Sequence, residues 1–231
     1  MEMTSREAAQ RLHVSDRQVR RLVAAGDLRS RILGGRLLVD MGAVDQRLQS
    51  TPGRGRPMSA RAAWGVLWEL SGERAAWLSA TERSRLRARL RTATAESLAL
   101  AVRRRAVRHD LRVVPQYLEA VVEADDVVAG GISAAQSVDA DVVGLGAAEV
   151  YCTASTLDEL RRRFGLSERG DANVTVRVPI LQETPLLTGR DTMPAAVVAM
   201  DLLESPDVRT RRAGHDVAER LFASRRGNIA A

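Results

Sequence analysis

The residues in this 231-residue sequence best suited to a chemical role are arginines. All 35 basic residues are arginine, since the sequence contains no lysine. On a helical wheel, Arg17, Arg20 and Arg21 fall on one face, and the apolar residues between and beyond them fall on the opposite face. A guanidinium group can donate two hydrogen bonds to guanine or can hold a phosphate, so this face suits nucleic acid.

Two short helices and a hairpin are expected to position this face. Thr4 with Glu7, and Ser15 with Gln18, have the spacing of capping boxes, which predicts helices at about 5–12 and 16–25 with a three-residue turn between them. Gly34-Gly35, between the short runs 29–33 and 36–39, predicts a two-residue β-hairpin. A third helix is expected at about 41–49.

Together these elements predict a winged helix-turn-helix over residues 1–50. In such a unit the second helix enters the major groove and the hairpin contacts the backbone or minor groove. The alternative is that the arginines form only the solvated face of an amphipathic helix, but the turn and hairpin favour DNA. The candidate DNA-binding residues are Ser15, Arg17, Gln18, Arg20, Arg21, Arg29, Arg31, Arg36, Arg54 and Arg56.

Residues 51–58 form a predicted basic linker, because their prolines and glycines cannot join a core. Within it, Arg54-Gly55-Arg56-Pro57 matches the core of a minor-groove AT-hook, with a flexible basic tether as the alternative. The net charge is +12 over residues 1–115 and −6 over residues 116–231. We therefore expect nucleic acid to contact only the N-terminal half of the chain.

Residues 59–231 predict an α+β regulatory domain, with a mainly helical segment followed by a mixed α/β part. Helices are expected at about 59–70, 81–92, 94–106, 116–123, 132–138, 156–164, 195–203 and 207–223, and strands at 111–114, 127–129, 149–153 and 174–180. Gly130-Gly131 is better explained as a tight turn than as a phosphate loop, and Cys152 as a buried thiol.

This second part of the sequence shows no acid-base pair and no metal-ligand spacing, so neither an enzyme, a cofactor nor a metal is expected. The sequence also lacks an apolar run near the roughly 20 residues that would span a bilayer. A cytoplasmic protein that does not bind membranes is therefore expected.

Two stretches resemble known families. Residues 4–28, TSREAAQRLHVSDRQVRRLVAAGDL, resemble the excisionase and MerR-type winged helix-turn-helix, which implies groove-facing positions for Arg17, Arg20 and Arg21 and a place near the wing tip for Arg36. Residues 194–214, with 55–64, resemble the AbiEi antitoxins of type IV toxin-antitoxin systems. That resemblance implies a repressor of its own operon whose C-terminal domain opposes a nucleotidyltransferase-like AbiEii toxin.

Three functions remain open on the sequence: this antitoxin and autorepressor, an excisionase-like architectural protein of recombination, and an enzyme acting on nucleic acid. The excisionase is less favoured, because such proteins are little more than the winged unit, whereas the longer part of this chain follows the linker. Since a unit of about 50 residues offers only one groove contact, we expect a dimer or cooperative binding to the double-stranded operator.

Overall fold

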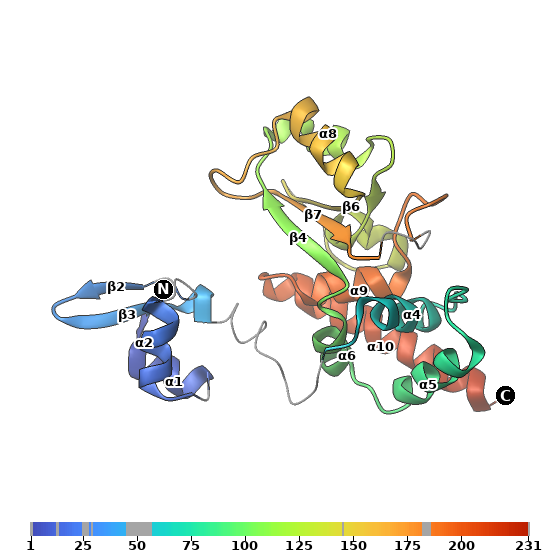
Figure 1. Ribbon diagram of the computed structural model, residues 1–231, viewed down its shortest axis with the longest axis horizontal. Coiled ribbons are helices and arrows are strands. Elements are labelled where there is room, and N and C mark those ends of the chain that lie inside the picture. Colours follow the sequence, from blue (N-terminus) through green and yellow to red (C-terminus); the bar gives the residue numbers. More distant parts are fainter. Residues whose placement is uncertain are drawn as a thin grey trace. The chain divides into compact units, whose positions relative to one another are not determined.

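The computed structural model describes residues 2–12, 14–24, 28, 30–44, 57–144, 146–181 and 186–230. The chain divides into two compact units, Met1–Arg54 and Gly55–Ala231, and each is considered by itself (Figure 1). Most of the predicted 51–58 linker lies outside the described residues, but Met58 is buried in the core of the second unit.

The first unit combines two helices with a three-stranded antiparallel sheet. Its elements are β1 (Glu2–Thr4), α1 (Ser5–Leu12), α2 (Asp16–Ala24), β2 (Ser30–Leu33) and β3 (Arg36–Asp40). The strand order is β1-β3-β2, so the predicted hairpin gains a third strand that the sequence analysis missed. Residues 41–44 are helical, and the rest of the helix predicted at 41–49 lies outside the described residues.

A small apolar core holds the first unit together. Helix α2 contributes Val19 and Leu22, which are 0% and 7% exposed, and these pack with Leu12 of α1 and Val39 of β3. The burial of Val19 and Leu22 confirms the predicted apolar face of α2. Because the apolar face is buried in this core, the opposite face points outward.

The second unit begins with helices whose starts are capped by hydroxyl side chains. These are α4 (Ala60–Leu70), α5 (Ala80–Leu90) and α6 (Ala95–Val102), preceded by Ser59, Ser79 and Thr94. The Ser79 and Thr94 caps are complete capping boxes. Helix α6 ends at Val102, before the predicted end near residue 106, because the chain turns there into a strand.

A mixed four-stranded sheet follows, in the order β4-β7-β6-β5. Its strands are β4 (Ala106–Leu111), β5 (Val128–Ala129), β6 (Ala148–Tyr151) and β7 (Val174–Pro179). The strand predicted at 111–114 is wrong in position, since β4 ends where that prediction begins. The reason lies beyond Leu111: the Arg112 amide bonds to the Ser167 carbonyl and the Val113 amide to Asn173 Oδ1, so the chain leaves its pairing with β7.

Helices cover both faces of this sheet (Figure 1). Leu157 and Leu160 of α8 (Ala154–Phe164) pack with the even-numbered valines of β7, near the short helices η1 (Pro115–Tyr117) and α7 (Leu118–Val122). The opposite face meets η2 (Gly131–Val138) and α9 (Ala195–Leu203), and α9 packs on α10 (Val208–Ala230). Helix α9 is buried along most of its length, which places its Asp201, and Glu204 at its C-cap, against the sheet.

Candidate nucleic-acid interface and the buried ion network

Local hydrogen bonds fix the starts of α1 and α2. At the start of α1, Thr4 and Glu7 exchange both bonds of a capping box, at 2.7 and 3.2 Å. At the start of α2, Ser15 Oγ accepts from the Gln18 amide at 3.2 Å, which is one of the two bonds of the second predicted box. Ser15 and Gln18 therefore have a structural role in starting α2, beside the DNA contact predicted for them.

The exposed face of α2 carries the three arginines singled out by the sequence. Arg17, Arg20 and Arg21 are all exposed, on the side opposite the buried Val19 and Leu22. Asp16, at the start of the same helix, pairs with one of them: its Oδ2 accepts from Arg20 Nε at 2.8 Å. Hydrogen bonds from the Ser5 hydroxyl and from Arg20 lower the pKa of Asp16 below its ordinary value.

The hairpin has the geometry that its two glycines require. Leu33 and Arg36 face each other across a two-residue turn, and Gly34 and Gly35 have φ of +56° and +75°. Positive φ at both central residues is typical of the type I′ turn, which suits glycine. Next to the turn, Arg31 forms a forked ion pair with Glu2, with Nε–Oε1 at 2.7 Å and Nη2–Oε2 at 2.8 Å.

The other predicted contacts are less well defined. Arg36 begins β3, but its side chain lies outside the described residues, as do Arg29, Arg54 and Arg56 entirely. The structure therefore brings Arg17, Arg20 and Arg21 together on one helix and holds Arg31 against Glu2 in the sheet. The Glu2 partner was missed because β1 itself was not predicted.

Comparison with known proteins bears on this unit. Residues 2–52 match the helix-turn-helix domain family. The match covers less than a quarter of the chain and indicates a DNA-binding role for the N-terminal unit. Among curated proteins and solved structures, none matches the chain.

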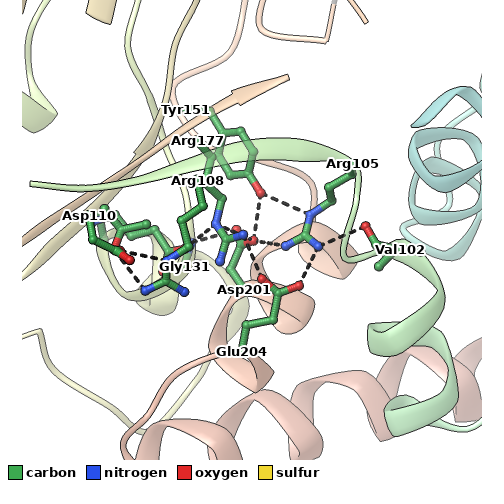
Figure 2. A network of polar contacts seen from close by, with 12 residues as sticks. Val102, Arg105, Arg108, Asp110, Gly131, Tyr151, Arg177, Asp201 and Glu204 are labelled. Carbon is green, nitrogen blue, oxygen red and sulfur yellow. Dashed lines mark hydrogen bonds and ion pairs between the residues drawn. The ribbon is translucent and has the colours of Figure 1, made fainter. Parts of the chain in front are cut away.

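The second unit contains a different arrangement of charge, a buried network between the sheet and α9 (Figure 2). At its centre Arg105, fully buried, donates to Glu204 Oε1 at 2.7 Å, to Asp201, and to the Tyr151 hydroxyl at 3.3 Å. Tyr151 in turn donates to Asp201 Oδ1 at 2.7 Å. The carboxylate oxygens Glu204 Oε1 and Asp201 Oδ1 thus each accept from a buried donor.

Arg177 of β7 is the second buried cation of this network. Its Nε lies 2.6 Å from Glu149 Oε1 and its Nη1 lies 2.7 Å from Glu204 Oε2. Burial would raise the pKa of Glu204, but Arg105 and Arg177 outweigh it and lower that pKa to about 2. For Glu149 burial dominates and raises the pKa despite the adjacent Arg177. Three carboxyl groups share two buried guanidinium groups, which explains why the effect of burial on the pKa of Glu149 is not fully offset.

The network supports packing of the sheet on α9. Asp201 is 1% exposed, and its Oδ2 accepts from the Gly131 amide at 3.2 Å. A Cβ on Gly131 would lie 1.9 Å from Glu149 Oε2, so the Gly130-Gly131 turn allows a close approach of backbone to this carboxylate. Sequence patterns do not mark the charged residues of this network, because these residues come from elements far apart in the chain.

Two other features of the described residues bear on chemistry. Cys152 is buried, as predicted, and desolvation raises the pKa of its thiol to about 12, so it is a poor nucleophile. Within the described part of the chain, His, Cys, Asp and Glu form no group of three or more that could hold a metal ion. In the same part, no helix has the length and apolar character needed to cross a membrane.

Proposed function

We propose that this chain is a transcriptional repressor that binds the operator of its own operon. The observation that carries the proposal is the orientation of α2 in a unit that matches helix-turn-helix domains: Val19 and Leu22 are buried while Arg17 and Arg21 are exposed. A recognition helix of this kind contacts base edges from its N-terminal residues; Arg17 lies in the first turn of α2, and Arg21 lies about one turn further along the same face.

The β2–β3 hairpin is proposed to act as the wing of this unit. Its arginines would contact phosphates, which position a protein on DNA without reading sequence. Arg31 would exchange its pairing with Glu2 for a phosphate, at little cost because both side chains reach solvent. One such unit spans a single groove, so tight binding requires two copies on the operator.

A mobility-shift assay on the chain's own promoter tests the DNA-binding part. Replacing Arg17 or Arg21 by alanine should weaken operator binding by about 1–3 kcal/mol if the contact is to a base. Arg162→Ala is the matched control, since it removes an exposed arginine from α8 of the second unit. Equal affinity for all three variants and the native chain would remove α2 from the recognition role.

We further propose that the second unit opposes a nucleotidyltransferase-like toxin without catalysis of its own. The support is the resemblance of residues 194–214 to AbiEi antitoxins, together with the burial of Arg105, Arg177 and Asp201 inside the fold. Co-expression of the full chain with the product of the neighbouring reading frame tests this. Rescue of growth supports the antitoxin, whereas stimulated strand exchange with an adjacent integrase would support the excisionase-like alternative.

A further inference from the structure

The three arginines of α2 have different surroundings. Arg20 is paired with Asp16 at 2.8 Å, one helical turn before it. Among the ion pairs that the described residues form, none involves Arg17 or Arg21. The pairing therefore distinguishes Arg20 from its two neighbours on the same exposed face.

Asp16 is itself held from the other side by α1. Interaction with the Ser5 side chain is the largest of the causes that lower the pKa of Asp16, and Ser5 is only 8% exposed at the first position of α1. Ser5 is thus fixed in the core of the unit, and it orients Asp16, which in turn orients Arg20. This chain of contacts connects the folded core to a guanidinium group on the DNA-facing side.

A carboxylate in this position is unfavourable for simple phosphate binding. It repels the DNA backbone and neutralises an adjacent arginine, so a helix that only held phosphates would gain by lacking it. The pairing with Asp16 occupies the Nε–H of Arg20 and leaves the N–H groups of both terminal nitrogens. Two such donors are what the O6 and N7 atoms of guanine accept in the major groove.

We infer that Asp16 is a positioning residue that holds Arg20 to read one guanine of the operator. The inference rests on the proposed DNA binding by α2 and names the base and the residue pair that would read it. Holding the guanidinium in advance reduces the side-chain entropy lost on binding. The Asp16 carboxylate also weakens binding to DNA sites where α2 can contact only phosphates. The difference in affinity between operator and random duplex therefore increases.

The test selects preferred sequences from a randomised duplex library with the full-length chain. Four proteins are compared: native, Arg20→Ala, Asp16→Asn and the double variant. Arg20→Ala should lose one guanine preference, and Asp16→Asn should weaken the preference at that same position about tenfold. The double variant should lose no more than Arg20→Ala alone, because Asp16 acts through Arg20.

Glu2→Gln is the matched control, since it removes a carboxylate of the same unit that pairs with Arg31 instead. It should bind all duplexes more tightly without changing base preference. The slope of log K against log salt concentration should become steeper by about 0.9, the value for one additional phosphate contact. Ser5→Ala keeps the Asp16 charge but frees the carboxylate, and should partly reduce the guanine preference. Circular dichroism and thermal melting confirm that each variant is folded.

The outcomes separate this inference from the proposed function. If Arg17→Ala or Arg21→Ala weakens binding while Asp16→Asn keeps every base preference, the reader assignment is overturned and DNA binding by α2 stands. If Asp16→Asn tightens binding to all sequences equally, Asp16 only competes with phosphate and the inference is also overturned. If the native chain enriches no sequence, both the inference and the sequence-specific repressor are wrong.

Discussion

Removing the fully buried Arg105 is expected to destabilise the second unit strongly. The variant Arg105→Met keeps much of the side-chain volume but leaves Asp201 and Glu204 with one cation fewer. Loss of one partner of a buried ion pair costs about 3–5 kcal/mol. The structure favours the lower part of that range, because Glu204 keeps Arg177 at 2.7 Å and Asp201 keeps the Tyr151 hydroxyl at 2.7 Å.

Tryptophan fluorescence can follow this loss in the intact chain. All three tryptophans lie in the second unit, and Trp64 Nε1 donates to the Arg105 carbonyl at 3.0 Å. For a unit of this size, about 3–5 kcal/mol corresponds to a fall in Tm of roughly 6–20 °C. Arg104→Met is the matched control, because Arg104 is the adjacent residue and is exposed.

The result that would refute this reasoning is an Arg105→Met variant within about 1 kcal/mol of the native chain, the range of ordinary surface changes. A second comparison uses the double variant Arg105→Met/Asp201→Asn. Because the neutral amide no longer needs a buried cation, the double variant should be more stable than the sum of the two single losses predicts. Simple additivity would mean that the two groups are not energetically coupled.

The two other buried carboxyls of the network should give opposite pH dependences of unfolding. The pKa of Glu204 is lowered to about 2, so its contribution to the free energy of unfolding is present above its ordinary pKa and is lost as the pH falls towards 2. Glu204→Gln should therefore lower the free energy of unfolding, measured in urea, by up to about 3 kcal/mol at neutral pH. In acid this difference from the native chain should vanish. The pKa of Glu149 is raised, so its contribution is present below its ordinary pKa and is lost as the pH rises through the raised value. In Glu149→Gln the amide oxygen can still accept from Arg177 Nε, so the loss of stability at high pH should disappear. If this variant were destabilised more at high pH than at low pH, the raised pKa of Glu149 would be contradicted.

Local signals in the sequence predicted much of the fold. The capping box of Thr4 and Glu7, the Ser15 cap and the Gly34-Gly35 turn each depend on neighbouring residues, and the structure contains all three. The polar sequence of β4, Ala-Val-Arg-His-Asp-Leu, gave no strand signal. In the structure Arg108 and Asp110 lie on the sheet face that carries the ion network, and pair with each other at 2.8 Å.

Long-range pairing explains what the sequence could not predict. Arg105 meets Asp201 across 96 positions of the chain, and Arg31 meets Glu2 across 29. Nothing in the local pattern around any of these residues marks its partner, because the contact exists only once the strands and helices are packed. The exposed arginine face of α2 was accessible to sequence reasoning because a helix places its own face by periodicity alone.

Arginine has different roles in the two units because its surroundings differ. The side chains of Arg20 and Arg31 are 63% and 61% exposed, so water and salt screen their pairs with Asp16 and Glu2. Such pairs add little to stability, so Arg31 can exchange Glu2 for a phosphate, and Arg20 can keep Asp16 on Nε while its terminal nitrogens remain open to a base. Arg105 and Arg177 are almost fully buried, so their carboxylates cannot be exchanged without unfolding the sheet from α9. Arginine in the first unit is therefore available to a ligand, and arginine in the network fixes the fold.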